Sequence, residues 1–158
     1  MRSFRAPRAL ITALALSSLA ASAHAAGAPI TVIVWGLRYS DGTVHVDVCT
    51  RETFLRGGCP YSAVAPAKIG ETTITVEGVP PGVYAIQAFH DFKNTGRLEQ
   101  GPLGIPREGI AFSQDPPLGL HGPSFDRASF THGNTPQTLR LRLIRFKKAP
   151  PTQPAGPG

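Results

Sequence analysis

Residues 71–90 read ETTITVEGVPPGVYAIQAFH, two runs rich in β-branched and aromatic residues on either side of a Pro-Pro-Gly break. In the first run, Ile74 and Val76 alternate with polar residues, which is the period of a strand with one buried face. The break ends that strand, and the second run predicts another strand over 83–90. This stretch therefore predicts β structure on both sides of the break.

The same signals recur towards the N-terminus. Residues 30–37 (ITVIVWGL) are rich in β-branched residues, and residues 43–50 place Val44, Val46 and Val48 on one face. Asp41-Gly42 lies between these two runs and predicts a tight hairpin turn that joins them.

Towards the C-terminus, strands are expected over 125–131 and over 139–143, where Leu alternates with Arg. The alternation slips at Leu143-Ile144, which indicates a bulge or a sheet edge. Helix signals are nearly absent, and we expect at most one helical turn, over 51–54. Six or seven short strands with turn signals between them predict a β-sandwich.

The first 25 residues have the layout of a secretory signal. Arg2, Arg5 and Arg8 precede an apolar run over 9–21, and Ala-His-Ala at 23–25 offers a small-x-small cleavage pattern. The run is about 13 residues, whereas a membrane anchor needs about 20. We therefore expect a signal peptide over 1–25, cleavage near Ala25, and a periplasmic or secreted protein with no transmembrane segment in the mature chain.

The mature chain divides into a β-sandwich domain over 26–148 and a Pro-rich tail over 149–158. The tail has no large apolar residue, so we expect it to be disordered. The net charge of the whole chain is +6, but three Arg lie in the signal and five basic residues cluster between Arg140 and Lys148. The charge therefore does not indicate nucleic acid binding. The basic cluster could hold an anionic envelope polymer or lipid headgroup, but a solvated face that guards an exposed edge is the favoured interpretation.

Cys49 and Cys59 are the two cysteines of the chain. An even number of cysteines in an exported protein predicts a disulfide. Metal binding by the two thiols and nucleophilic catalysis by Cys59 are the weaker alternatives.

Residues 91–123 contain five Pro and six Gly and show no clear periodicity. Loops of this length in small domains are usually functional or disordered. A disordered linker would not need so many apolar residues, so we interpret this segment as a structured loop that packs on one end of the sandwich. The apolar residues are Leu98, Leu103, Ile105, Ile110, Phe112, Leu118 and Leu120.

Two stretches carry a family resemblance. One is GVPPGVY at 78–84; the other runs from FHD at 89–91 through LGIPREG at 103–109 and FS at 112–113 to GPSF at 122–125. Together they resemble the bacterial exported-protein family called domain of unknown function 2141. The resemblance implies an all-β fold, a single immunoglobulin-like or transthyretin-like β-sandwich of about seven strands with one long structured loop. It implies no established reaction.

In that family the His-Asp pair opens the pattern H-D-x-N-x-N-G-x-L-D, an array of oxygen side chains that resembles half of a calcium loop. Here Asp91, Gly96 and Glu99 fit the pattern and Thr95 is a weak, neutral substitute for Asn or Asp, but Lys93 stands where an oxygen ligand belongs. Its ammonium would repel a cation and could replace one by pairing with Asp91. We therefore interpret the array as a degraded calcium loop, and we predict no metal and no cofactor.

Five titratable residues in or beside the long loop are the candidate functional residues: His90, Asp91, Glu99, Glu108 and His121. Their spacing matches no catalytic signature, so no residue is assigned as catalytic. His45 and His132 are expected at solvent-facing positions without a role. Trp35 and Tyr84 are expected in the core or at a corner, not on a sugar-stacking surface.

Two functions remain open from the sequence. The favoured one is a non-enzymatic binding or envelope-accessory module, whose partner is an unknown ligand or envelope protein and not nucleic acid. The alternative is a hydrolase-like enzyme that uses His90, Asp91 and Glu108, which requires these three side chains to converge in a pocket.

Overall fold

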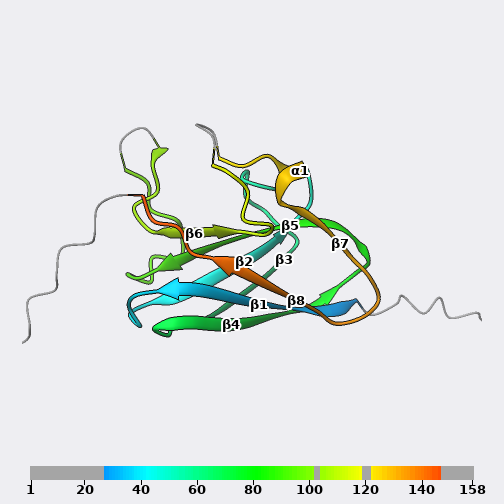
Figure 1. Ribbon diagram of the computed structural model, residues 1–158, viewed down its shortest axis with the longest axis horizontal. Helices are drawn as coiled ribbons and strands as arrows, with labels where there is room; N and C mark the ends of the chain where they lie inside the picture. The colour runs from blue at the N-terminus through cyan, green and yellow to red at the C-terminus, as the bar shows by residue number, and fades with distance from the viewer. Residues whose placement is uncertain (1–26, 102–103, 119–121, 147–158) are drawn as a thin grey trace, which may run out of the picture.

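The computed structural model describes residues 27–101, 104–118 and 122–146, and it has two β-sheets packed face to face (Figure 1). The first sheet has the order β4-β1-β8, with β4 at Gly70–Val79, β1 at Ala28–Leu37 and β8 at Gln137–Arg142. Strands β1 and β4 are antiparallel, whereas β1 and β8 are parallel. The predicted all-β sandwich is confirmed.

The second sheet has the order β3-β2-β5-β6, with β3 at Tyr61–Pro66, β2 at Thr43–Cys49, β5 at Gly82–Asp91 and β6 at Gly109–Phe112. A short helix, α1 (Phe125–Ala128), leads into β7 (Ser129–His132), which pairs with the first part of β5. Strand β6 pairs with the last part of β5 on the same edge. Strand β5 is therefore flanked by β2 along one edge and by two short strands along the other.

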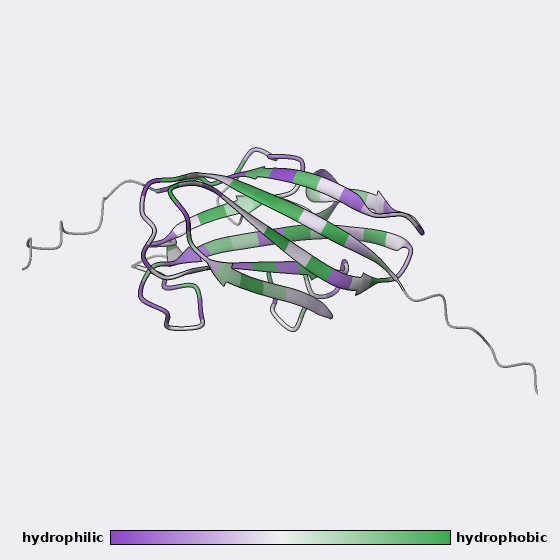
Figure 2. Cartoon of the chain, turned by 90° about the horizontal axis from the view of Figure 1, so that it is seen from below, coloured by the Kyte–Doolittle hydropathy of each residue, from purple (hydrophilic) through white to green (hydrophobic). Residues whose placement is uncertain are grey.

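The core between the sheets follows from the period-two alternation of the strands. Apolar residues alternate with polar ones along the strands (Figure 2), and the inward-facing side chains are almost completely buried. Each fully buried Val, Leu or Ile stabilises the fold by about 1.5–3 kcal/mol. The inward-facing set includes Ile30, Val32, Val34, Val44, Val46, Val48, Ile74, Val76, Tyr84, Ile86, Ala88 and Leu141.

The hairpin predicted at Asp41-Gly42 is wrong. Strands β1 and β2 lie in different sheets, so the segment between them crosses from one layer to the other. The crossing is fixed by long-range bonds, since the Asp41 carbonyl contacts Nε2 of His90 at 2.7 Å and the Gly42 carbonyl accepts from the Ala67 N–H at 3.1 Å. A Cβ at Gly42 would lie 2.0 Å from the Asp91 carbonyl oxygen, so this close approach requires glycine.

Two local expectations also need correction. Residues 125–131 do not form one strand, because helix α1 occupies the first four of them. Strands β3 and β6 were not predicted, and β6 lies inside the segment that was interpreted as a loop. The turn expected over 51–54 is present, because the Phe54 N–H donates to the Thr50 carbonyl at 3.0 Å, which is the spacing of one helical turn. The expected slip after Leu143 is present: β8 ends at Arg142, and Ile144 bridges to Ile110.

Three side chains lie elsewhere than expected. His132 is not solvent-facing but buried, with its ring nitrogens beside the Ala28 carbonyl oxygen at 3.2 Å and Gln137 Oε1 at 2.9 Å. His45 is largely covered because it stacks on Phe89, with ring centroids 4.6 Å apart. Trp35 is 41% exposed on the outer face of β1 and is not a core residue, whereas Tyr84 is buried as expected.

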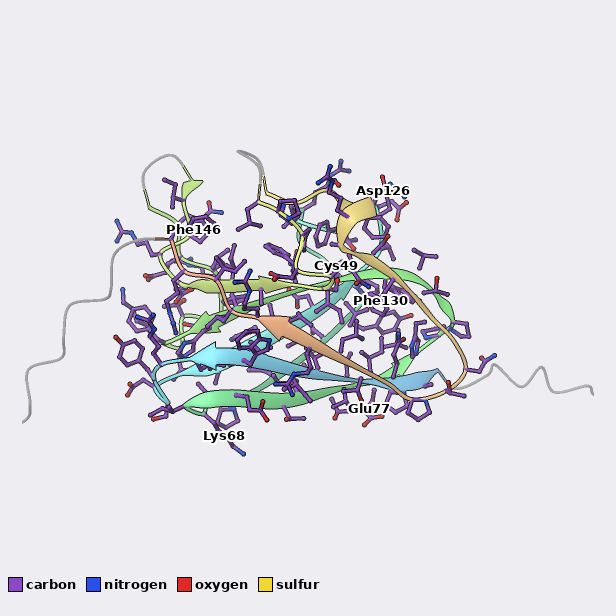
Figure 3. The ribbon with its side chains drawn as sticks, viewed as in Figure 1. Cys49, Lys68, Glu77, Asp126, Phe130 and Phe146 are labelled. Carbon is purple, nitrogen blue, oxygen red and sulfur yellow. A yellow bond between two sulfur atoms is a disulfide. The ribbon has the colours of Figure 1, made fainter. Side chains whose placement is uncertain are left out.

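The predicted disulfide between Cys49 and Cys59 is present, with the two Cα atoms 4.6 Å apart. Cys49 is the last residue of β2, as labelled in Figure 3, so the bond ties the 50–60 segment back to the second sheet. Among the residues that the structure describes, no helix has the length and apolar character needed to cross a bilayer.

Replacing both cysteines by serine should lower the free energy of unfolding by about 2–3 kcal/mol, because the bond closes a short loop that the unfolded chain otherwise leaves open. Urea unfolding monitored by circular dichroism measures this difference. Wild-type protein unfolded in the presence of a reductant is the control and should lose a similar amount. Equal stability of the oxidised and reduced proteins would contradict the expectation.

Candidate functional site

A second cluster of apolar side chains lies on the outer face of the second sheet, away from the sandwich core. Its sheet residues come from β2, β5 and β6, and its covering residues come from the 50–60 segment, the long loop, α1 and the C-terminal segment. The buried members are Cys49, Phe54, Ala85, Ile110, Phe112 and Ala128, with Phe89, Leu98, Leu118, Phe125 and Phe146 packed around them.

Aromatic packing holds one side of this cover in place. The ring of Phe54 meets the rings of Phe112 and Phe125 edge-on, at centroid distances of 5.9 and 6.0 Å. Arg51 lies 4.7 Å over the ring of Phe125 and forms an ion pair with Asp126. The 50–60 segment and α1 therefore form one side of the covering layer.

The other side of the cover is the long loop, anchored where it leaves β6. Ser113 is fully buried; its N–H donates to the Ile86 carbonyl at 3.0 Å, and its hydroxyl oxygen accepts from the Ile86 N–H at 2.8 Å. Within the loop, Gln100 and Pro106 form an isolated bridge. The described part of the long loop is thus ordered and packs on the second sheet.

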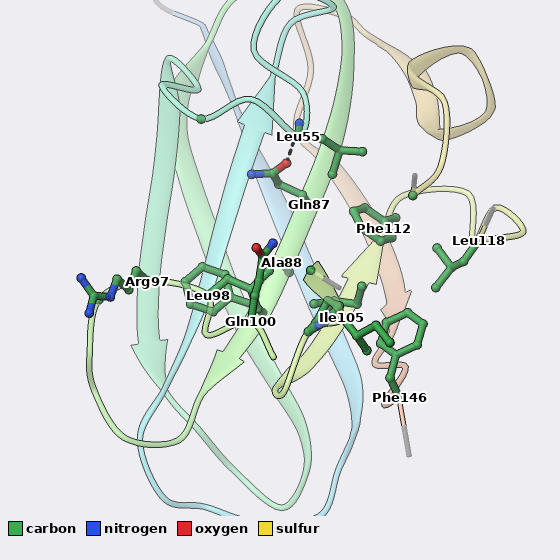
Figure 4. A pocket seen from close by; sticks show the side chains of 17 residues that line it. Leu55, Gln87, Ala88, Arg97, Leu98, Gln100, Ile105, Phe112, Leu118 and Phe146 are labelled. Atoms are coloured by element: carbon green, nitrogen blue, oxygen red, sulfur yellow. Dashed lines mark hydrogen bonds between the residues drawn. The ribbon is translucent and has the colours of Figure 1, made fainter. Parts of the chain in front are cut away.

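The cover leaves a hollow of about 580 Å³ between the loop and the sheet (Figure 4). This volume lies within the range of small-molecule sites, which are typically 300–1,000 Å³ and mostly apolar. We call this hollow the groove. Its wall includes the apolar side chains of Leu98, Ile105, Ile110, Phe112, Leu118 and Phe146.

The polar groups of the groove are few and mostly engaged. Gln87, which lies on β5, accepts a hydrogen bond from the Leu55 N–H and donates one to Asp47, both at 3.1 Å. Gln100 and Arg97 come from the long loop, and both side chains are exposed. The groove therefore has a mostly apolar wall with a few polar groups.

Asp91, at the end of β5, closes the turn that begins the long loop. Its carboxylate is fully buried and accepts hydrogen bonds from the Thr95 N–H at 2.9 Å and the Gly96 N–H at 2.7 Å. Burial alone would raise the pKa of Asp91, but these bonds and nearby His45 together hold it below its ordinary value. Asp91 is thus a structural anion that caps the turn.

Glu108 is the second buried carboxyl at this end of the sheet. One oxygen accepts a hydrogen bond from the Glu99 N–H at 3.1 Å, and the other has no hydrogen-bond partner among the described residues. Burial raises the pKa of Glu108, and the charge of Asp91 raises it further. This carboxyl therefore keeps its proton to a higher pH than a free glutamate does.

The expected pairing of Lys93 with Asp91 is wrong. The ammonium of Lys93 contacts Glu99 Oε2 at 3.0 Å, at the exposed side of the turn. Asp91 is satisfied by backbone N–H groups instead, because the turn folds back over its carboxylate. No group of three or more His, Cys, Asp or Glu side chains suitable for a metal ion occurs in the described part of the chain.

The candidate functional residues do not all meet. Asp91 and Glu108 are close neighbours. The residues next to them in the sequence, His90 and Gly109, pair directly across β5 and β6. Adjacent residues of a strand point to opposite faces, so His90 points away from Asp91, and its Nε2 contacts the Asp41 carbonyl. Glu99 faces Lys93, and His121 lies outside the described residues.

His45 lies near both a hydroxyl and a carboxylate, but the arrangement differs from a proton relay. Its Nε2 is 3.1 Å from Thr43 Oγ1 and 3.6 Å from Asp91 Oδ2. In a Ser-His-Asp triad the hydroxyl and the carboxylate contact different ring nitrogens. A single nitrogen shared by both groups cannot pass a proton from one to the other.

The basic residues near the C-terminus are mostly paired at the surface. Arg140 pairs with Glu71 and Arg142 with Asp115, and Arg145 donates to the Gly36 carbonyl at 3.2 Å. Lys147 and Lys148 lie outside the described residues. Arg140 and Arg142 thus fit the solvated strand face that the sequence favoured, whereas Arg145 is half-buried and its Nη2 has no hydrogen-bond partner among the described residues.

The sequence pointed to the long loop but missed the groove. Leu98, Ile110, Phe112 and Leu118 of this segment pack in the second apolar cluster, as the sequence predicts, whereas Ile105 is exposed. Phe146 and Gln87 were missed, because nothing local shows that the C-terminal segment and the outer face of β5 meet under that loop.

The two buried carboxyls predict opposite pH effects. For Asp91, whose folded pKa is lowered, the stabilisation is present above its unfolded pKa of about 3.9 and is lost as the pH falls through the folded pKa. For Glu108, whose folded pKa is raised, it is present below about 4.3 and is lost as the pH rises through the folded pKa.

Two variants separate these effects in urea unfolding between pH 3 and 8. Asp91→Asn should lose about 1–3 kcal/mol at neutral pH, because an amide cannot accept both backbone hydrogen bonds. Glu108→Gln should lack the loss of stability that wild type shows as the pH rises above about 4.3. Parallel pH profiles for wild type and Glu108→Gln would contradict the assignment.

Comparison with known proteins gives one match. Residues 32–140 match a bacterial family, domain of unknown function 2141 (DUF2141), described as an uncharacterized protein conserved in bacteria. The match covers well over half of the chain, from β1 to β8. No curated protein and no solved structure matches the chain significantly. The chain is therefore a member of the family domain of unknown function 2141.

Proposed function

We propose that this protein is an exported, non-enzymatic binding module whose ligand occupies the groove on the outer face of the second sheet. The observation that carries this proposal is the hollow of about 580 Å³ with a mostly apolar wall. Burying apolar ligand surface there would release about 25 cal/mol per Å² of area. The ligand is a small molecule with an apolar body.

The construction of the groove supports a binding role. Its floor is the sheet itself, where β5 is held between β2 and β6, and its walls are loops anchored by a disulfide, an aromatic cluster and the buried Ser113. A pre-formed site of this kind loses little conformational entropy when a ligand enters. Binding is therefore favoured over a purely structural role for the long loop.

The hydrolase-like alternative has less support. It requires His90, Asp91 and Glu108 to converge, whereas His90 points to the opposite face of β5 from Asp91. The Asp91 carboxylate is engaged by two backbone N–H groups. A general base must instead be free to reach the proton that it removes.

A binding module of this kind fits a periplasmic or secreted location. The signal-like layout of residues 1–25 supports export, and the Cys49–Cys59 disulfide is compatible with an oxidising compartment. The working protein would then consist of the sandwich domain over 26–148 followed by the Pro-rich tail over 149–158.

Removing an apolar side chain from the wall should weaken binding of an uncharged probe. Ile105 lines the groove and is 48% exposed, so Ile105→Ser removes apolar contact area with little cost to folding. Isothermal titration with 1-decanol below its solubility limit should show binding to wild type and an affinity reduced about threefold to tenfold in the variant.

The matched control is Ile69→Ser, since Ile69 is 70% exposed, lies between β3 and β4 and does not line the groove. This variant should bind 1-decanol as wild type does. No binding of 1-decanol to the wild type, or equal losses in both variants, would refute the groove as the site.

Export makes a separate prediction. When the full-length gene is expressed in a bacterial host with a functional secretion system, the mature protein should begin at Ala26, because the Ala-His-Ala pattern ends at Ala25. The intact mass of protein from the envelope fraction measures this. Retention of residues 1–25 would refute it.

A further inference from the structure

We propose that the ligand of the groove is an amphiphile, an alkyl or acyl chain that carries one anionic headgroup bound by Arg97 and Arg107. This inference rests on the proposed binding function and names the ligand class. It is drawn from a second, polar hollow that adjoins the groove.

The polar hollow measures about 390 Å³ and is lined by the loop segment 97–100 together with Lys93 and Arg107. Residues Arg97, Leu98 and Gln100 line both hollows, so the two spaces adjoin along this segment. Arg97 extends its guanidinium outward at the edge of the groove, away from the apolar side chains (Figure 4). An elongated ligand could therefore lie in the groove with its end at Arg97.

The charge of the polar hollow favours an anion. Its ionisable side chains are Lys93, Arg97, Arg107 and Glu99. Lys93 is neutralised by Glu99 at 3.0 Å, whereas Arg97 and Arg107 are exposed and form no ion pair with any described residue. The pair of guanidinium groups is thus left with a net charge of about +2.

Nearby acidic groups do not cancel this charge. The Asp91 carboxylate is buried and satisfied by backbone N–H groups, and the buried Glu108 carboxyl accepts a hydrogen bond from the Glu99 N–H. Neither carboxyl is among the residues that line the polar hollow. Arginine binds carboxylate and phosphate groups with two parallel hydrogen bonds, which suits a headgroup at the mouth of an apolar site.

The experiment compares three ten-carbon probes of different charge by isothermal titration, with 1-decanol below its solubility limit and the two ionic probes below their critical micelle concentrations. Decanoate should bind about tenfold more tightly than 1-decanol, and decyltrimethylammonium should bind no more tightly than 1-decanol. In Arg97→Gln and in Arg107→Gln the affinity for decanoate should fall towards that for 1-decanol, and in the double variant it should equal it, while the affinity for 1-decanol stays unchanged. Raising the salt concentration should reduce only the decanoate advantage.

The control variant is Arg127→Gln, because Arg127 is exposed on α1 and lines neither hollow. It should bind decanoate as wild type does. Equal affinities for decanoate and 1-decanol in wild type, with no effect of Arg97→Gln, would overturn the headgroup inference and leave the groove proposal standing. Failure of all three probes to bind would overturn both.

A final arm separates a single bound amphiphile from a membrane surface. Sedimentation measures binding to vesicles of neutral phosphatidylcholine, with or without anionic phosphatidylglycerol. We expect Arg97→Gln to leave any vesicle binding of the wild type unchanged. Binding to the anionic vesicles without binding of monomeric decanoate would overturn the inference, since the arginines would then contact a lipid surface and not an enclosed ligand.

Discussion

The fold depends on the burial of β5 on both of its faces. Its inward side chains complete the core between the two sheets, while Ala85 and Phe89 on the other face need a second apolar layer. A sheet with one solvated face would expose the large apolar side chains of β6 as well. The 50–60 segment, the long loop, α1 and the C-terminal segment provide that layer. Much of the irregular part of the chain is thus explained by the need to cover one strand and its neighbour.

A disulfide and a buried carboxylate hold the covering layer in place. A disulfide holds one covering segment to the end of β2, and the buried carboxylate of Asp91 organises the turn that opens the long loop. Loops can adopt fixed shapes when their polar groups are satisfied in this way. The cover still leaves a hollow against the sheet, and an unfilled apolar space costs dispersion contacts that a ligand can restore.

The two buried carboxyls near the long loop have opposite pKa shifts although they are neighbours. Asp91 and Glu108 sit side by side on the outer face, yet backbone N–H groups lower the pKa of the first while burial raises the pKa of the second. Lys93 points outward and pairs with Glu99, because the Thr95 and Gly96 N–H groups occupy the position beside the Asp91 carboxylate where a cation would bind. The altered calcium-like pattern is therefore explained as a capped turn whose charged side chains face solvent.

The alternation of apolar residues by itself determined the sandwich class and the inner faces of β2 and β4, because side-chain period is a local property of the chain. The number of apolar residues in the 91–123 segment predicted that it packs on the domain, and the even number of cysteines in an expected exported chain predicted the disulfide. Only the tertiary structure decided that β1 and β2 belong to different sheets, that Trp35 is exposed, and that residues from 87, 98 and 146 meet around one groove. Strand pairing and loop packing depend on contacts between residues far apart in the sequence. The local pattern therefore does not indicate which distant surface a strand or loop will contact.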